Sequence, residues 1–341
     1  LGVFFSPAGD GAKHVQMMVG KGELWLDRLQ AKPLPSRDAW LSFFIQLYPG
    51  MDWGLHTVIL PPKKLEALFQ ALYYKCLSKL GVNRCITREW RMLPPRYLGL
   101  GMPNMVVNCL AGKIFFLQCS WGFEEAECEM MRQAYEAFLI EVGLSGDVFQ
   151  RNFAKLGILS TPGTWFSNLW ELASHLGVSI STDSKYHLKP ARIGDELINE
   201  RFLSMDMEES DLEPLNRVRK HKKVLFLSDL VHCDGTTIRA NMMDNSEGVS
   251  PLWFPREKPT KKDYELWNST LGTISSAGLQ LQTRLGPFVN KGASDRNWFI
   301  SEDGNNLYHA KIVDFEDVYT VYVKNNQPCS TRQKRRFTRE S

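Results

Sequence analysis

Nine basic side chains lie in one segment of the chain, Pro61 to Lys113. They are Lys63, Lys64, Lys75, Lys79, Arg84, Arg88, Arg91, Arg96 and Lys113. With two acids, Glu66 and Glu89, the segment carries +7, whereas the whole chain carries +3 and the remainder therefore −4. Clustered like charges repel one another unless a counter-charge binds, and Lys and Arg neutralise phosphates. The cluster favours nucleic-acid binding over the alternative, a merely solvated surface.

Aromatic side chains lie among these bases and could stack on nucleobases, because every base offers a flat π face. Trp90 and Tyr97 are the stronger candidates, since both lie in the predicted loop that carries the arginines. Tyr73 falls on the apolar face of a predicted helix and is expected in the core. The candidate binding residues are therefore the nine bases together with Trp90 and Tyr97.

Two helices and a loop must position these residues. Apolar residues at helical spacing predict a helix over 61–81, with Pro62 in its first turn and Gly81 as its left-handed cap. A loop over 82–101 carries the four arginines, and a second helix starts at Pro103. That second helix is expected to be buried on nearly all sides, with inward residues Val107, Leu110, Ala111, Ile114 and Leu117.

A second group of chemically capable residues follows the apolar stretch 224–227, which reads as a strand. It comprises Asp229, His232, Cys233 and Asp234. Asp234-Gly235 is also an ordinary turn signal, and no second ligand cluster at a known spacing accompanies it. A metal-dependent nuclease centred on Asp229 and Asp234 would need a further carboxylate within about 4–5 Å to share a divalent ion.

Further along the chain, local signals predict several element boundaries. Acids precede bases over 206–223, as the helix dipole favours, although a partner-binding surface is an alternative explanation. Ser210 and Glu213 predict a capping box for that helix, and Thr260 predicts the cap of a later one. A hairpin is predicted over 298–313 around Asp303-Gly304, followed by a strand over 318–323.

Length and composition allow two or three folded domains, since the chain has 341 residues of which 43% are hydrophobic. We expect an α+β fold that is predominantly α-helical. The predicted parts are a helical module over 1–160, a mixed helical and strand region over 161–245, a small α+β unit over 246–328 and a disordered basic tail over 329–341.

Seven cysteines without a Cys-x-x-Cys pair are typical of a reducing compartment, so we expect the nucleus or cytoplasm and no secretion. No apolar run approaches the ~20 residues of a membrane-spanning helix, so no membrane partner is expected. The chain opens at Leu1 with a strand-like stretch, Leu1–Phe5, from which we expect a piece of a longer polypeptide.

Several short motifs resemble the region downstream of the catalytic palm in non-LTR (LINE-type) retrotransposon reverse transcriptases. They are Leu1-Gly2-Val3 before a turn, Ala39-Trp40, Leu47-Tyr48-Pro49, and Gly99-Leu100-Gly101-Met102-Pro103-Asn104 before the apolar helix that contains Lys113. The similarity covers residues 1–120. Looser similarity continues in Trp253-Phe254-Pro255-Arg256-Glu257 and the residues after it.

The resemblance implies that the module over 1–160 is thumb-like and holds the primer–template duplex as it leaves the polymerase active site. Its parent enzyme copies RNA into DNA with two Mg²⁺ ions on paired aspartates. This sequence has no Asp-Asp pair, so we expect that site in an N-terminal palm of the same polypeptide and no catalytic residue, metal or cofactor here. The implied partners are that palm and an RNA/DNA or DNA duplex, contacted through phosphates. The main alternative is a helical protein–protein interaction module with no nucleic-acid role, which would need an exposed apolar groove.

Overall fold

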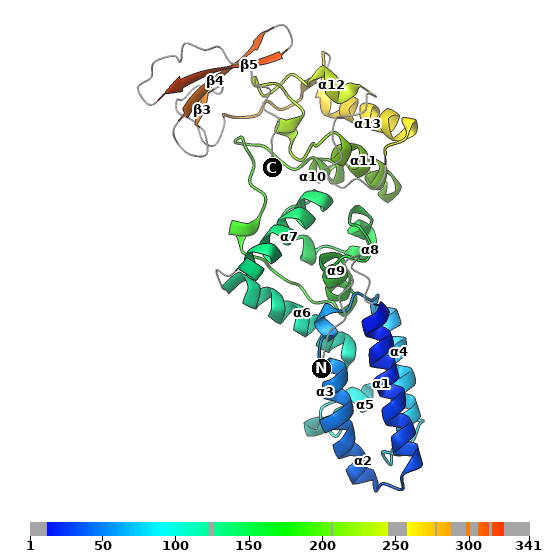
Figure 1. Ribbon diagram of the computed structural model, residues 1–341. Coiled ribbons are helices and arrows are strands. Elements are labelled where there is room, and N and C mark those ends of the chain that lie inside the picture. The colour runs from blue at the N-terminus through cyan, green and yellow to red at the C-terminus, as the bar shows by residue number, and fades with distance from the viewer. Residues whose placement is uncertain are drawn as a thin grey trace. The chain divides into compact units, whose positions relative to one another are not determined.

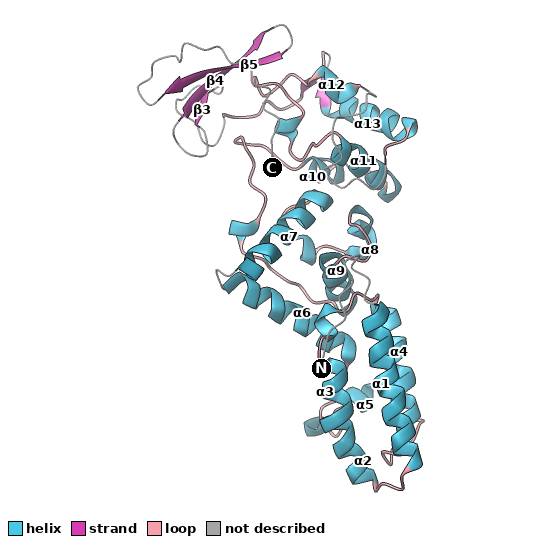
Figure 2. Cartoon of the chain, viewed as in Figure 1, coloured by secondary structure: helices cyan, strands magenta, loops and turns pink. Residues whose placement is uncertain are grey.

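The computed structural model describes residues 12–122, 126–205, 207–244, 258–276 and 278–287, and the backbone of 298–300, 306–313 and 316–323 (Figure 1). The chain is predominantly helical, which confirms the predicted class (Figure 2). It divides into two compact units. The first unit comprises Leu1–Tyr135 and Asp147–Thr182, and the second comprises Glu136–Gly146 and Asp183–Ser341.

The first unit is built from helices. They are α1 (Ala12–Ala31), α2 (Ser36–Ser42), the π-helical η1 (Phe43–Leu47), α3 (Tyr48–Asp52), η2 (Leu55–Thr57), α4 (Pro62–Cys76), α5 (Arg88–Met92), η3 (Pro95–Tyr97), α6 (Met105–Gly122), the start of α7 (Ala126–Val142), η4 (Val148–Gln150), α8 (Phe153–Leu156), η5 (Gly157–Leu159) and α9 (Trp165–Leu176). Edge-on ring contacts of Phe43 with Trp25 and Tyr73 join η1 to α1 and α4.

Helix α4 forms largely as its sequence predicts. Its apolar face is buried, Pro62 occupies the first turn, and Gly81 has φ +73°. The regular helix ends at Cys76 and continues as turns to Gly81. The Tyr73 hydroxyl donates to the Pro103 carbonyl at 3.0 Å, which fixes the start of α6 against α4. Burial raises the pKa of Tyr73 well above its usual value, so this hydroxyl stays a donor.

Helix α9 shows where the predicted organisation differs from the structure. The Thr164 side chain accepts the Ser167 N–H at its N-cap, and Gly177 ends the helix with φ +66°. The indole N–H of Trp170, a fully buried residue, donates to the Arg151 carbonyl at 2.8 Å, within the first unit. The boundary expected near residue 160 therefore lies inside this unit, because α9 packs back onto α4 and α6.

The second unit contains η6 (Ser184–Tyr186), α10 (Ile198–Leu203), α11 (Glu209–His221), η7 (Leu227–Asp229), α12 (Ala240–Met243) and α13 (Lys261–Ile274). The predicted Thr260 cap of α13 is confirmed, and it is part of a capping box in which Thr260 and Asp263 bond each other's backbone N–H groups. The capping box predicted for α11 from Ser210 and Glu213 is wrong. That helix starts at Glu209, and the Ser210 hydroxyl bonds the Glu208 carboxylate instead.

Two antiparallel sheets complete the second unit. One pairs β1 (Ser275–Ser276) with β2 (Gln280–Leu281), and the other has the order β3 (Trp298–Ile300), β4 (Asn306–Val313), β5 (Glu316–Val323). Phe299 pairs with Tyr308, and Ala310 pairs with Tyr319, which confirms the predicted hairpin and the last strand. The expected disordered tail over 329–341 lies outside the described residues.

Arg219 organises the interior of the second unit. Its guanidinium is fully buried and donates to the Asn216 side chain and to the carbonyls of Ile140, Glu141 and Val224, at 2.7 to 3.2 Å. These bonds satisfy the carboxyl end of α7, where carbonyls lack helical partners. Gly143 has φ +66°, and a Cβ there would overlap the Arg219 side chain.

Candidate nucleic-acid interface

The solvent-facing side of α4 carries three of the predicted binding residues. Lys63, Lys64 and Lys75 are exposed, whereas the opposite side of the helix is buried. Lys64 and Lys75 are eleven residues apart, which is roughly 16 Å along a helix, or about five phosphate steps along one strand. The exposed residues between them include Ala67 and Ala71, whose small side chains leave room for a nucleic-acid backbone.

Two of these lysines stand where a helix disfavours positive charge. Lys63 and Lys64 lie in the first turn of α4, which has no acidic residue. The positive end of the helix dipole repels cations there by roughly 0.3–1 kcal/mol each. Folding stability therefore does not explain their position, whereas an anion would be attracted by both lysines and by the positive end of the helix dipole.

The arginine-bearing loop folds back on itself and onto α4. The N–H groups of Leu100, Gly101 and Met102 donate to the carbonyls of Trp90, Leu93 and Arg91 at 2.8 to 3.0 Å. A Cβ at Gly99 would overlap the Leu93 carbonyl, and Gly101 has φ +66°. The Gly-Leu-Gly sequence is thus required for a closed loop.

The four loop arginines have different partners. Arg84 is exposed and lies over the Tyr74 ring at 5.4 Å, next to Lys75. Arg96 lies over the Tyr97 ring at 4.8 Å. Arg88 donates to the Glu66 carboxylate at 2.8 Å, and this hydrogen bond holds the pKa of Glu66 below its usual range. Arg91 is half-buried, and its Nε has no hydrogen-bond partner within the described structure.

The structure thus brings together four exposed bases, which we call the basic stripe: Lys63, Lys64, Lys75 and Arg84. Lys79 is half-buried just beyond α4, and Arg96 forms a separate pair with Tyr97. Trp90 and Tyr97 keep 47% and 56% of their surface exposed, so both rings are accessible for stacking. Arg88 contributes less free charge, because Glu66 neutralises it.

Lys113 is placed differently from the expectation. Its side chain is fully buried, with the ammonium 4.7 Å from the centre of the Trp165 ring. It therefore cannot contact the phosphates of a nucleic acid bound at the surface. The buried residues of α6 are Met105, Val106, Cys109, Leu110, Lys113, Leu117 and Ser120. The face that the sequence predicted to point inward lies on a different side of the helix. The helix is also not buried on nearly all sides, because Phe115 and Phe116 are exposed. Lys113 lies four residues from both Cys109 and Leu117, so helical spacing could have predicted its burial. Its charge favoured the opposite prediction.

Replacing Lys113 with Met should stabilise the protein at neutral pH. Burial lowers the pKa of Lys113 to about 8, and its ammonium has no hydrogen-bond partner among the described residues. The unfolded chain holds the proton more tightly, with a pKa near 10.4, so the charged lysine costs about 3 kcal/mol below pH 8. Met removes that penalty and forfeits a cation–π contact of about 0.5–2 kcal/mol, so we expect a net gain of about 1–2 kcal/mol.

Urea unfolding at pH 7 and pH 10 measures this effect. The free energy of unfolding of the wild-type chain should approach that of Lys113→Met as the pH rises from 8 to 10.4, because in this range the unfolded state binds protons that the folded state has lost. Lys75→Met, on the exposed side of α4, is the matched control; it retains Lys113, so its stability should follow that of the wild type at both pH values. A Lys113→Met protein that is less stable than wild type at pH 7 would show that the ammonium has a stabilising partner.

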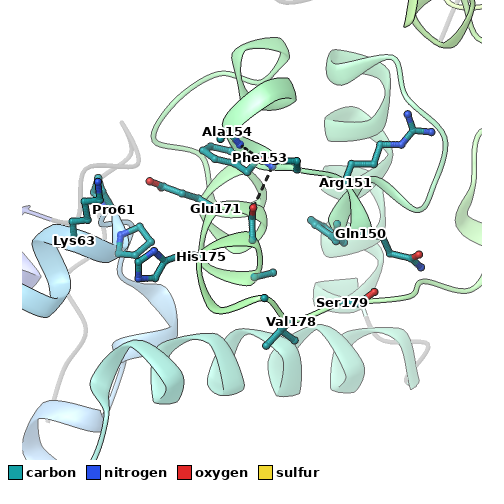
Figure 3. A pocket seen from close by; sticks show the side chains of 16 residues that line it. Pro61, Lys63, Gln150, Arg151, Phe153, Ala154, Glu171, His175, Val178 and Ser179 are labelled. Atoms are coloured by element: carbon teal, nitrogen blue, oxygen red, sulfur yellow. Dashed lines mark hydrogen bonds between the residues drawn. The ribbon is translucent and has the colours of Figure 1, made fainter. Parts of the chain in front are cut away.

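A hollow of about 740 Å³ adjoins the amino end of α4 (Figure 3). Lys63 lines it, together with Arg151 and Phe153 at the start of α8 and Glu171 and His175 of α9. The Phe153 N–H donates to the Ser174 hydroxyl at 3.3 Å across its wall, and burial raises the pKa of Glu171. Only Lys63 was predicted here, because the other residues come from distant segments.

The carboxylates of the nuclease alternative serve as backbone caps. Asp229 accepts the N–H groups of Leu225 and Phe226, each at 2.9 Å. In place of the strand expected over 224–227, Phe226 forms a single bridge with Leu197 and η7 begins at Leu227. Asp234 accepts from the N–H and hydroxyl groups of Thr237, at 3.0 and 2.6 Å. Over the described ranges, no three His, Cys, Asp or Glu side chains are grouped to hold a metal ion.

Comparisons with known proteins find no matching family model, curated protein or solved structure. The resemblance to reverse transcriptases therefore stays a prediction from short motifs. None of the helices in the described ranges combines the length and apolarity that crossing a membrane requires.

Proposed function

We propose that the first unit is a helical module that binds a nucleic-acid duplex through its phosphates, without reading sequence. Within that class, we propose the thumb and downstream region of a LINE-type retrotransposon reverse transcriptase, with an RNA/DNA primer–template duplex as its ligand. The Mg²⁺-dependent polymerase site would belong to a palm elsewhere in the parent polypeptide.

The observation that carries this proposal is the basic stripe. Lys63, Lys64 and Lys75 are exposed on α4, and Arg84, from the loop that follows, lies over the ring of Tyr74 on the same helix. Two of them stand where they oppose the helix dipole. Nearby Glu66, which would repel phosphates, is covered by Arg88. Lysines on a helix surface contact phosphates as point charges, so such a surface binds by charge and duplex shape.

Exchanging Lys63 and Lys64 for Ala tests the proposal with two readouts of opposite sign. Affinity for an RNA/DNA duplex of about 20 base pairs should fall by about tenfold at 50 mM salt, equally for two unrelated sequences. Thermal stability should rise slightly, because two cations leave the positive end of a helix. Fluorescence anisotropy and calorimetry measure the two effects.

Lys261→Ala/Lys262→Ala is the matched control, since these exposed lysines occupy the first turn of α13 in the second unit. It removes the same charge and should leave duplex affinity within about twofold of wild type. Equal losses from both double variants would mean that net charge alone drives binding. An unchanged affinity in Lys63→Ala/Lys64→Ala would overturn the role of the basic stripe.

A further inference from the structure

A second hollow of the first unit, about 670 Å³, lies between α1 and the arm formed by α2, η1 and α3. Four large apolar residues line it and remain exposed: Leu24 (52%), Leu34 (41%), Leu41 (58%) and Ile45 (64%). They come from both walls and from the α1–α2 connection. A gathering of exposed leucine and isoleucine side chains around one hollow is characteristic of an interaction site rather than of an ordinary surface.

The floor of this groove is rigid. Trp25 is buried there, and its indole N–H donates to the Ser42 hydroxyl at 2.9 Å, which links α1 to α2. The Ser42 hydroxyl in turn donates to Gln46 at 3.1 Å, and Phe43 packs edge-on against Trp25. Because these bonds already hold the groove in place, a ligand that binds there does not carry the entropic cost of ordering it.

A π-helical segment forms part of the second wall. In η1 the Tyr48 N–H donates to the Phe43 carbonyl, five residues back, which widens the helical turn. Ile45 lies in this segment and is the most exposed of the four apolar residues. π-Helical turns are rare and occur frequently at functional sites, which is a second and independent indication that this wall is used.

The charges around the groove select an acidic partner. Lys21, Arg28 and Lys32 line it, against one acid, Asp38. Lys21, Trp25 and Arg28 follow helical spacing and share one side of α1, and Lys32 comes directly after its last residue. The acids of α1, Glu23 and Asp27, do not line the groove. The apolar floor therefore has a net positive rim.

We propose that this groove binds an amphipathic helix of a partner protein, with leucine-type residues at i, i+3 or i+4, and i+7, and with Asp or Glu beside them. Exposed aliphatic side chains supply the anchoring surface, as in other helix-in-groove complexes. A duplex would use the basic rim and gain nothing from Leu41 or Ile45. This site is separate from the basic stripe, so it does not depend on the proposed duplex binding.

A pair of synthetic peptides of about 18 residues tests the proposal on the intact chain. Both carry Leu at i, i+3, i+4 and i+7, and the flanking positions are Glu in one and Lys in the other. Anisotropy of labelled peptides should show at least tenfold tighter binding of the Glu peptide at 100 mM salt. Leu41→Gln/Ile45→Gln should lower that affinity at least tenfold, and both positions are exposed enough to spare the fold.

Charge reversal supplies a readout that a structural role would not produce. Lys21→Glu/Lys32→Glu should exchange the preference, so that the Lys peptide binds tighter. Equal binding of both peptides, no binding of either, or retained affinity in Leu41→Gln/Ile45→Gln would overturn the proposal. Displacement of the Glu peptide by duplex from the Lys63→Ala/Lys64→Ala variant, which lacks two bases of the basic stripe, would assign the rim to nucleic acid instead.

Discussion

Removal of the four bases in the basic stripe should flatten the salt dependence of duplex binding. Each phosphate contact contributes about −0.9 to the slope of log affinity against log salt, so Lys63, Lys64, Lys75 and Arg84 together contribute about −3.6. Between 50 and 200 mM salt, the wild-type affinity should fall about 100-fold more than that of the fourfold Ala variant. Titration of an RNA/DNA duplex by anisotropy at five salt concentrations gives both slopes.

The same titration separates phosphate contact from base recognition. Loss of phosphate contacts weakens binding to every sequence alike, whereas loss of a base contact acts on one sequence. Arg88→Ala is a useful comparison. Because Arg88 is already paired with Glu66, its loss should change the slope by less than one unit. A flat salt response of the wild-type chain, or a fourfold variant with the wild-type slope, would remove the electrostatic basis of the proposed function.

Replacement of Arg219 with Ala should destabilise the second unit by about 3–5 kcal/mol, because several backbone carbonyls lose their donor, at a cost of about 1–3 kcal/mol for each buried one. The variant leaves the carbonyls of Ile140, Glu141 and Val224 without the donor that Arg219 supplies. It also opens a cavity beside Gly143. Hydrogen exchange of the α10 and α11 amides, with urea unfolding, measures the loss.

Arg201→Ala is the control for this effect. Arg201 lies on α10 in the same unit, about one third exposed, and its ion pair with Glu196 spans 3.8 Å. Pairs of this kind contribute at most about 1 kcal/mol. Arg219→Lys should remain clearly destabilised, because one ammonium cannot reach four acceptors spread around a planar guanidinium. A wild-type exchange pattern in Arg219→Ala would show that the buried arginine is not needed for this unit to form.

Local signals predicted much of the secondary structure. The apolar stripe of α4, the Thr260 cap of α13 and the β3–β4 hairpin depend on neighbours within a few residues or one hairpin, so local sequence was enough to predict them. The predictions of a capping box at Ser210 and of a strand over 224–227 were wrong, because in each place a competing local hydrogen bond forms. Ser210 bonds Glu208, and Asp229 caps the backbone of Leu225 and Phe226.

The sequence by itself determined that this chain is mostly helical and that positive charge gathers around α4, because composition and periodicity act over short distances. Only the tertiary structure decided which bases face solvent. Lys113 is buried against Trp165, Arg88 is neutralised by Glu66, and Arg219 is enclosed by carbonyls of α7, since in each case the partner lies far away in the chain. The groove between α1 and η1 likewise arises from packing, because no single segment contains both of its walls.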